Sequence, residues 1–567
     1  MIFMFVLSTD DPVINLNQRF FFLLICMLLP SSCIAPVTPP PVNMAPVHIP
    51  KPGVTEVTPA STALPTATFL PNAQTIDVSI WAPPYLDETL GAALDPSLRG
   101  LFVSDAAAAN IRLEVGDGNL VSQWVYALVT PFPSTLQGVS GDDLLLRWQG
   151  QAAGIPVLLM DPSTHDMFTA LWGPAGGTGV LVLPKDELLD HAWAGRPSLA
   201  IVPFEDLDPR WKVLPVDGLS PIHRDFDPAS YRLKVPISLI TDPGRAALIQ
   251  SNFSIPSSNF YPQKMTVMAV TGVTALVRAT AFTMERRGMT YPAEDIRDWL
   301  LEADITHISN EVPFAADCPY PNPTQPDVRF CSGDHTIQLL EDIGTDVVEL
   351  TGDHFHDWGT DAMFHTLDMY RERGWPYYGG GADLADGRKA LLLEHNGNRI
   401  AFIGCNAKGG SFAQASETQP GAVPCDLDWM AGEIGRLRAE GVLVIATFQH
   451  HEYYTYPAQP AQQQDFRQMA EAGAVIVSGS QAHQPQGMEF TTNGSFIHYG
   501  LGNLFFDQYS VCDACRQGLI DRHVFYDGRY ISTELLPIQF IDFARSRPMT
   551  VEETNELFQT LFLASGW

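Results

Sequence analysis

Basic residues are scarce in this sequence. The 567 residues include 33 Lys and Arg against 64 Asp and Glu, which gives a formal net charge of -31. A general nucleic-acid binder would carry a basic face, and an acidic chain repels polyanions unless a cation or a local basic patch intervenes. The composition therefore excludes nucleic acid as an expected partner, and it requires a positive site for any acidic substrate.

The apolar run near the N-terminus is too short to cross a bilayer. It covers ten residues, Phe20–Leu29, and follows Arg19, which is typical of the core of a signal peptide. The run ends in LPSSC, which resembles a bacterial lipoprotein cleavage site. We therefore expect residues 1–33 to act as a signal peptide and Cys33 to carry lipid. The protein would then be exported and anchored to the outer face of the cytoplasmic membrane or to the cell surface; the alternative is a plain secretory signal with an incidental cysteine.

Cysteine is sparse, with eight in the whole chain. Setting aside Cys26 in the signal peptide and Cys33 leaves an even number, which suits disulfide bonding in an exported protein. Proximity along the chain suggests three pairs, which are Cys318 with Cys331, Cys405 with Cys425, and Cys512 with Cys515. The last pair forms a CxxC that can instead be a redox or metal motif, although a single CxxC is weak evidence for zinc.

Residues 34–72 contain almost no charged side chains and are rich in Pro, Thr and Ala. This composition predicts an extended linker. From residue 73 to 250, strand-like runs such as VYALVTPF alternate with helical stretches such as DDLLLRWQG, which indicates an α/β domain. Its pattern resembles the periplasmic solute-binding proteins. No catalytic constellation stands out there, so this domain either binds a small ligand or serves as a scaffold.

A second α/β domain is expected over residues 262–545, with a C-terminal helix or tail at 546–567. Several of its apolar runs end in polar turns; the clearest is ELTGDHFHDWG, residues 349–359, where Asp353 and His354 follow a short strand. Gly272 is expected to make a tight turn between the first strand and the helix after it. In open α/β sheets a site lies beyond the carboxyl ends of the strands, so one crevice can gather these polar groups.

The polar side chains at the predicted strand ends, together with Arg278 one or two helical turns beyond Gly272, are the candidate site residues. Those at the strand ends are Asn310, Glu311, Asp353, His354, His450, His451, Glu452, Gln481, His483, His498 and Asn503. His356 and Asp357 are expected to support this set. Taken alone, the cluster has a second explanation. Asp353 would cap the following helix, and the histidines would be ordinary surface or packing residues.

The order and spacing of these turns resemble the CapA family of poly-γ-glutamate capsule biosynthesis proteins. The family pattern runs as a GD turn with a following Arg, an NLE-like turn, NNHxxDxG, HWGxEY, GHHPH and YSLGNFxFDQ. The matching stretches here are GVTALVR (272–278), SNE (309–311), GDHFHDWG (352–359), HHEYY (450–454), GSQAH (479–483) and YGLGNLFFDQ (499–508). The resemblance implies a metallophosphatase-like domain that acts in capsule or poly-γ-glutamate synthesis, with the membrane-bound synthesis machinery as partner and an acidic polymer or small molecule as substrate.

The resemblance also implies which residues bind a metal and where this chain departs from the family. The implied metal ligands are Asp353, His354, His450 or His451, and His483. Val273 stands where the family has the Asp of its GD turn, and Ser480 and Gln481 replace two histidines of GHHPH. Asp353 replaces the second Asn of NNH and restores one carboxylate.

The remaining imidazoles and carboxylates suit one divalent ion, Zn, Mn or Fe, better than two. In this hypothesis Glu311 or Glu452 acts as general base, and Arg278 positions a carboxylate or phosphate of the substrate. The implied reaction is metal-dependent hydrolysis of a phosphoester or γ-glutamyl bond. The alternative is a non-catalytic factor that binds polymer or helps assemble the synthesis machinery.

Overall fold

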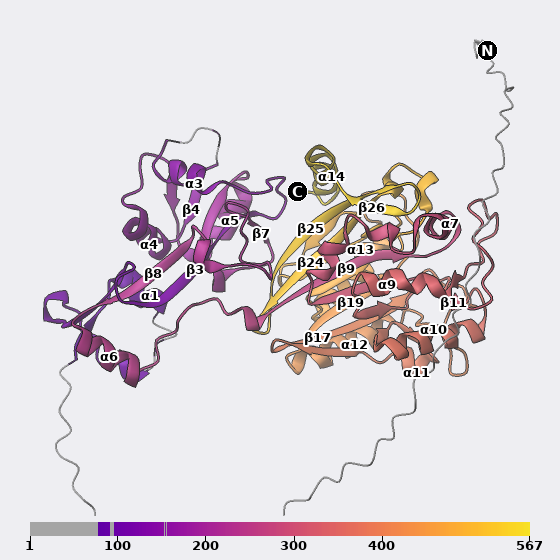
Figure 1. The fold of residues 1–567 in the computed structure, drawn as a ribbon, viewed down its shortest axis with the longest axis horizontal. Helices are drawn as coiled ribbons and strands as arrows, with labels where there is room; N and C mark the ends of the chain where they lie inside the picture. Colours follow the sequence, from indigo (N-terminus) through magenta and orange to yellow (C-terminus); the bar gives the residue numbers. More distant parts are fainter. Residues whose placement is uncertain (1–77, 91–93, 95, 152–153, 155) are drawn as a thin grey trace, which may run out of the picture. The chain divides into compact units, whose positions relative to one another are not determined.

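The computed structural model describes residues 78–90, 94, 96–151, 154 and 156–567. The expected signal peptide, the lipidation site at Cys33 and the linker at residues 34–72 lie outside this part of the chain. Within it, every helix is too short or too polar to cross a membrane. Both α/β domains that the sequence predicts are present (Figure 1).

The first domain is built on a mixed sheet in the strand order β1-β2-β8-β3-β6-β4-β5, with β7 paired to β3. Strand β3 organises the sheet because it is long, mostly buried, and pairs with β6, β7 and β8. The strands are β1 Ile80–Trp81, β2 Ile111–Val115, β3 Leu120–Pro131, β4 Leu158–Met160, β5 Val180–Val182, β6 Leu199–Pro203, β7 Trp211–Leu214 and β8 Lys234–Ile240. The helices are α1 Pro84–Leu90, α2 Pro96–Arg99, α3 Gly141–Trp148, α4 Pro162–Trp172, α5 Leu188–Ala194 and α6 Pro243–Asn252.

The second domain contains two large sheets. The first has the order β14-β13-β10-β9-β24-β25-β26 with β23 paired to β9, and the second has the order β16-β17-β19-β20-β22-β21. The strands of the first sheet are β9 Met265–Thr274, β10 Ile305–Asn310, β13 Val347–Glu349, β14 Tyr377–Tyr378, β23 Asn503–Phe505, β24 Gln517–Tyr526, β25 Arg529–Ile541 and β26 Arg545–Pro548. Those of the second are β16 Leu391–His395, β17 Asn398–Asn406, β19 Leu443–Gln449, β20 Ile476–Gly479, β21 Met488–Phe490 and β22 Phe496–His498.

These two sheets face each other, and helices cover their outer sides (Figure 1). Val270 and Val347 of the first sheet share one buried cluster with Phe402 and Ile445 of the second, so this core lies between the sheets. The covering helices of the first sheet are α7 Arg278–Arg287, α8 Arg297–Leu301, α9 Gln338–Asp342 and α10 Thr360–Arg373; those of the second are α12 Leu427–Ala439 and α13 Pro460–Ala472. The short pairs β11 Phe314–Ala315 with β12 Ser332–Gly333 and β15 Gly380–Gly381 with β18 Gly421–Ala422, and the helices α11 Leu384–Gly387 and α14 Val551–Ala564, complete the domain.

The central strands are buried along their whole length, so β9 and β19 read as mostly apolar runs rather than as alternating patterns, whereas β10 also buries polar side chains. Strands β9, β10 and β13 are parallel neighbours, and so are β17, β19 and β20. The crevice predicted for one open sheet is therefore formed by the strand ends of two stacked sheets.

Three disulfides link the predicted pairs, with Cα–Cα separations of 5.8 Å for Cys318–Cys331, 5.0 Å for Cys405–Cys425 and 5.1 Å for Cys512–Cys515. The prediction of these pairs is confirmed. The CxxC at Cys512 is thus a disulfide rather than half of a metal site. The first two bonds each close a loop at the edge of the predicted crevice.

Gly272 corrects one expectation, because it lies inside β9 and not in a turn. A Cβ atom at this position would clash with the carbonyl oxygen of Gly502. The amide of Val273 donates to that same oxygen at 3.1 Å. Gly272 is therefore required for the close approach of the segment before β23, and the helix α7 begins only at Arg278.

We predict that Gly272→Ala lowers the free energy of unfolding by at least about 2 kcal/mol, because backbone atoms must move to admit the methyl group. Gly432→Ala is the control, since a Cβ there meets nothing within 4 Å inside α12. This control should leave stability unchanged or raise it by up to about 1 kcal/mol. Urea unfolding of the three proteins measures both effects, and equal stabilities would contradict the role given to Gly272.

Candidate functional site

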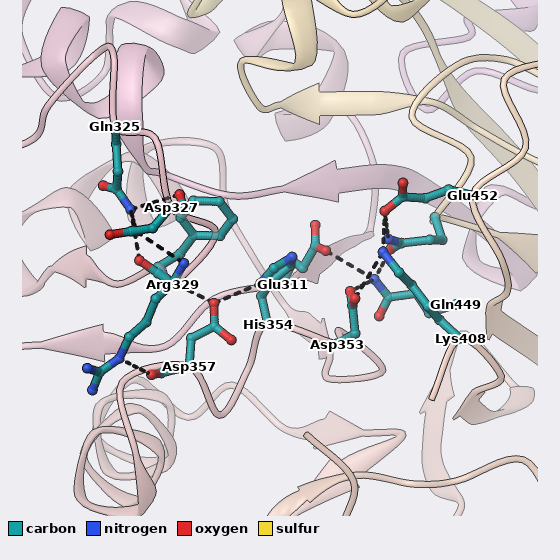
Figure 2. A network of polar contacts seen from close by, with 12 residues as sticks. Glu311, Gln325, Asp327, Arg329, Asp353, His354, Asp357, Lys408, Gln449 and Glu452 are labelled. Carbon is teal, nitrogen blue, oxygen red and sulfur yellow. Dashed lines mark hydrogen bonds and ion pairs between the residues drawn. The ribbon is translucent and has the colours of Figure 1, made fainter. Parts of the chain in front are cut away.

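The carboxyl ends of both stacked sheets supply one buried polar cluster (Figure 2). Glu311 follows β10, and Asp353 and His354 follow β13. From the second sheet, Gln449 ends β19 and Lys408 lies two residues beyond β17. Parallel strands whose carboxyl ends meet at one edge place these residues together, as the sequence predicts for several of them.

Gly352 brings the two acidic strand ends into contact. A Cβ atom at this position would lie 2.8 Å from Cα and 2.9 Å from the carbonyl oxygen of Glu311. Both are backbone atoms, so they cannot swing aside as a side chain does. The absence of a side chain at Gly352 therefore lets the turn that carries Asp353 pack directly on Glu311.

Glu311, Asp353 and His354 form the centre of the cluster, and we call them the triad. Each offers one ligand atom, and these atoms all lie within 4.8 Å of one another. Glu311 and Asp353 are 2% and 7% exposed. Atom Oε2 of Glu311 is buried without a hydrogen-bond partner among the described residues. A buried, unpartnered carboxylate oxygen is costly, and it points to a group that binds there.

Asp357 fixes the orientation of His354. Its Oδ2 atom lies 2.7 Å from Nδ1 of the imidazole and also accepts the backbone N–H of Phe330 at 2.9 Å. Nε2 is then the ring nitrogen left for a ligand. Histidines that bind metals are usually held in this way, by a carboxylate on the other nitrogen.

Lys408 supplies a cation on the other side of Asp353. Its Nζ atom lies 3.0 Å from Oδ2 of Asp353, and it forms a second ion pair with Glu452. The side chains of Lys408 and Glu452 are 27% and 31% exposed, so this pair lies nearer to solvent than the triad. Lys408 thus neutralises the outer part of the acidic cluster.

Amide side chains complete the network between the two sheets. Nε2 of Gln449 donates to Oε1 of Glu311 at 3.2 Å and to Oδ1 of Asp353 at 3.1 Å, and it also contacts Gln481. Nε2 of Gln481 donates to Oε1 of Glu452 at 3.1 Å. Gln449 therefore joins two carboxylates of the triad to a residue from the second sheet.

The surroundings shift the pKa values of the cluster in opposite directions. Burial, and next the charge of Asp353, raises the pKa of Glu311 to about 8. Burial also disfavours the charge on Asp353, but His354 and Lys408 outweigh it and lower the pKa of that carboxyl. For His354, burial is outweighed by Asp357 and the two triad carboxylates, which raise its pKa to about 9.

Several predicted residues lie beside the triad rather than in it. Nδ1 of His483 lies 2.9 Å from Oδ1 of Asn503, and Nε2 lies 3.9 Å from Oε1 of Glu452. Burial lowers the pKa of His483 to about 4, so its ring is neutral at physiological pH. His450 instead pairs with Asp465, Nε2 to Oδ2, at 3.0 Å.

Other candidates are used elsewhere in the fold. His451 is exposed, with its ring centre 5.1 Å from that of His450. His498 lies 2.6 Å from Asp521, and both are fully buried. The amide of Asn310 donates to the Val312 carbonyl and to the hydroxyl of Tyr370, and the ring of His356 contacts the Phe412 carbonyl. These contacts do not join the triad.

Arg278 is held by partners of its own. It begins α7 with a φ of 44°, and its guanidinium bonds Asp507 through Nε at 2.9 Å and Nη2 at 2.5 Å. Its guanidinium carbon lies 5.0 Å from the ring centres of both Phe330 and Phe506. Whether it also contacts substrate stays a prediction.

Sequence reasoning missed Lys408 and the amide of Gln449. Lys408 belongs to AKGG, directly after the run NRIAFIGCN, so its place after a buried strand was the available signal. Gln449 is the last residue of its strand and precedes the pair of histidines that drew attention instead.

The residues present fit one divalent ion but not a second. Two carboxylates and the Nε2 of a fixed histidine are a suitable ligand set for Zn, Mn or Fe. At the family's GD position, Val273 lies buried in an apolar cluster with Val312, Phe330 and Phe506. The outer carboxylate, Glu452, is already paired with Lys408.

Comparison with known proteins finds similarity to capsule synthesis proteins. Residues 267–508 match the family model described as bacterial capsule synthesis protein PGA_cap. Over this stretch the chain is similar to the CapA proteins of capsule synthesis. The PGA biosynthesis protein CapA of Bacillus subtilis (strain 168) is 27% identical over 183 residues, which cover 32% of this chain and 48% of that relative. The capsule biosynthesis protein CapA of Bacillus anthracis is 24% identical over 251 residues, which cover 43% of this chain and 61% of that one.

These alignments span less than two thirds of either CapA relative. Among solved structures, the 5'-nucleotidase precursor from Thermus thermophilus aligns with 53% of this chain and 59% of its own, at 10% identity and a TM-score of 0.31. An ABC-type phosphate transport receptor from Vibrio cholerae aligns with 31% of this chain and 92% of its own, at 10% identity and a TM-score of 0.26. Likenesses at these scores do not bear on function.

We predict that Lys408→Met lowers the free energy of unfolding by about 1–3 kcal/mol, because it leaves Asp353 and Glu452 without their shared cation. The control is Lys389→Met. The side chain of Lys389 is 74% exposed beside Asp386, so this substitution should change stability by no more than about 0.5 kcal/mol. Urea unfolding in the presence of a chelator compares the two variants with the wild type. Equal effects of both substitutions would remove Lys408 from the cluster's charge balance.

Proposed function

We propose that this protein acts in capsule or poly-γ-glutamate biosynthesis outside the cytoplasm, and that its CapA-like domain is a hydrolase that uses one divalent cation. The substrate is a phosphoester or γ-glutamyl bond of an acidic polymer or of a related small molecule. Its partners are the membrane-bound enzymes that make and export the polymer. The match to the capsule-synthesis family model supports the pathway, and the geometry of the triad supports the chemistry.

One observation carries the proposal of a cation. Oε2 of Glu311 is buried without a partner among the described residues, and it belongs to a set of three ligand groups that includes a histidine already oriented by Asp357. A carboxylate kept only for packing would have its oxygens satisfied by donors. The triad therefore has the features of a cation site, in which the ion would replace the proton that otherwise joins Glu311 to Asp353.

In this proposal Glu311, Asp353 and Nε2 of His354 hold the cation. A bound divalent cation lowers the pKa of a water molecule and polarises the bond to be cleaved. Gln449 holds the carboxylates of Glu311 and Asp353 in place through its amide. Glu452 lies at the exposed rim and accepts a proton from the attacking water, while Lys408 attracts an anionic part of the substrate.

We predict that protein purified without chelator holds one divalent ion per chain, measured by elemental analysis after dialysis. Asp353→Asn and His354→Gln should each abolish this binding, because each removes a member of the triad. His356→Gln is the matched control: it changes a histidine of the same turn whose ring contacts the Phe412 carbonyl. The control should retain the ion.

The same proteins test hydrolysis of poly-γ-glutamate and of bis(p-nitrophenyl) phosphate. Wild type and His356→Gln should cleave one of these substrates, and the two triad variants should not. A wild-type protein without stoichiometric metal would rule out the metal-dependent hydrolase.

A non-catalytic assembly factor is the second candidate, and Lys408 favours it. Its ammonium gives Asp353 and Glu452 an internal cation, and Val273 removes a carboxylate that the family pattern carries. A protein of this kind would bind polymer without cleaving it. It would contain no stoichiometric ion, so the elemental analysis separates the two candidates.

Export and lipid anchoring at Cys33 are part of the main proposal. The apolar run before LPSSC and the three disulfides of the described chain support an oxidising destination. A long tether of residues 34–72 would separate the folded domains from the membrane.

We predict that Cys33→Ser moves the protein from the membrane fraction to the soluble exported fraction, because the acceptor of the lipid is lost. Cys26→Ser is the control, since this residue lies in the apolar run before the cleavage site. Immunoblots of fractionated cells measure the distribution. A Cys33→Ser protein that stays in the membrane fraction would show that anchoring has another source.

A further inference from the structure

A cavity of about 650 Å³ lies beside the triad but is not part of it. One wall is the segment between Cys318 and Cys331, and the other is the start of α7. We call this cavity the loop pocket, and the residues used below are Arg278, Tyr320, Gln325, Arg329, Phe330 and Trp358. Its size lies within the range of about 300–1,000 Å³ typical of small-molecule sites.

The wall of the loop pocket is built to hold its shape. The disulfide Cys318–Cys331 closes the segment, which contains four prolines between the two cysteines. The amide of Gln325 donates to the Arg329 carbonyl at 2.9 Å and to Asp327 at 2.7 Å. These constraints reduce the ordering that a ligand would otherwise have to impose.

The loop pocket and the triad share a wall. The ring centre of Phe330 lies 4.7 Å from that of His354 and 5.0 Å from the guanidinium of Arg278. The same residue donates its backbone N–H to Asp357, the carboxylate that orients His354. A chain bound in the pocket would therefore lie next to the proposed reaction site.

Arg329 is the cation in the loop pocket that is free to bind a ligand. Its Nε donates to the Asp357 carbonyl at 2.8 Å, and its guanidinium lies 4.7 Å above the ring of Trp358. Among the described residues, no acceptor bonds its two terminal nitrogens; Figure 2 shows them directed away from the triad. By contrast, Arg278 is paired with Asp507, and His335 is paired with Glu285.

The chemistry of this wall selects a carboxylate on an aliphatic chain. The planar fork of a guanidinium matches the two oxygens of a carboxylate. Tyr320, which is 65% exposed, and Trp358 offer apolar faces for methylene groups. In a γ-linked glutamyl chain, a free α-carboxylate alternates with two methylene groups at every residue. The carboxylate would bind the guanidinium, and the methylene groups would pack against the aromatic rings.

We propose that the loop pocket is a subsite for a γ-glutamyl oligomer, with one α-carboxylate bound by Arg329. The choice of polymer rests on the proposed function, but the pocket itself requires neither the cation nor hydrolysis. Arg329 would give a chain with a net charge of -31 one guanidinium with which to bind an acidic polymer, although Glu285 and Asp327 also line the pocket.

Isothermal titration with tri-γ-glutamate tests the proposal, using the full chain and no added metal. Wild type should bind, and Arg329→Gln should bind at least tenfold more weakly because a charge-assisted hydrogen bond is lost. Arg329→Lys, which keeps the charge without the fork, should fall between them. Arg371→Gln is the control, because this arginine is exposed on α10 and paired with Asp368. Thermal melts of each variant confirm folding.

Three outcomes would overturn the subsite: no binding by the wild type, equal binding by Arg329→Gln, or equal binding of trialanine. Displacement of the tripeptide by an equal concentration of inorganic phosphate would also overturn it, since that result defines a general anion site. Asp353→Asn separates this proposal from the hydrolase: it should lose the ion but keep the affinity for tri-γ-glutamate. Binding of the tripeptide by a metal-free wild type would leave the subsite standing while the hydrolase fails.

Discussion

The contact between Glu311 and Asp353 is the interaction on which the rest of the site depends. Two acidic groups that lie together out of water cannot both be charged without a large cost, so the pKa of Glu311 is raised while that of Asp353 is lowered. The neighbouring groups are arranged to offset this cost: the charges of Lys408 and His354 act on Asp353, and the amide of Gln449 bonds both carboxylates. These contacts offset part of the cost of the buried acidic pair, and they leave Oε2 of Glu311 without a hydrogen-bond partner among the described residues.

Both sheets are needed to build this arrangement. The first sheet brings the two acidic strand ends together, and Gly352 removes the side chain that would separate them. The second sheet supplies the donors, Lys408 and Gln449, so its stacking on the first provides the compensation for the buried charge. A substitution that moves one sheet against the other would thus disturb the electrostatics of the site without touching any of its residues.

The sequence predicts well which polar residues lie at strand ends, but it predicts poorly which side chains those residues contact. Runs such as the one before Asp353 identify buried parallel strands, and a shared edge follows from α/β topology, so Glu311, Asp353 and His354 are found together. The two-sheet stacking is not encoded in any local pattern, which is why Gln449 and Lys408 were missed. A histidine near a strand end does not by itself identify a site residue either. His498 lies near a strand end as His354 does, yet it pairs with Asp521 inside the core. Gly272 shows the same limit, because a turn and a close backbone contact both call for glycine.

The disulfide Cys405–Cys425 gives Lys408 a property beyond its charge. Cys405 precedes Asn406, whose side chain accepts the N–H of Gly409, so the lysine sits between a cross-link and a hydrogen bond in a loop closed over a sequence separation of 20 residues. With the bond formed, the chain has few ways to carry the ammonium away from Asp353. Reduction would remove this covalent constraint and leave the loop held by its hydrogen bonds, among them the one from the amide of Ala407 to the carbonyl of Gln449. The disulfide thus restricts where the charge of Lys408 can lie.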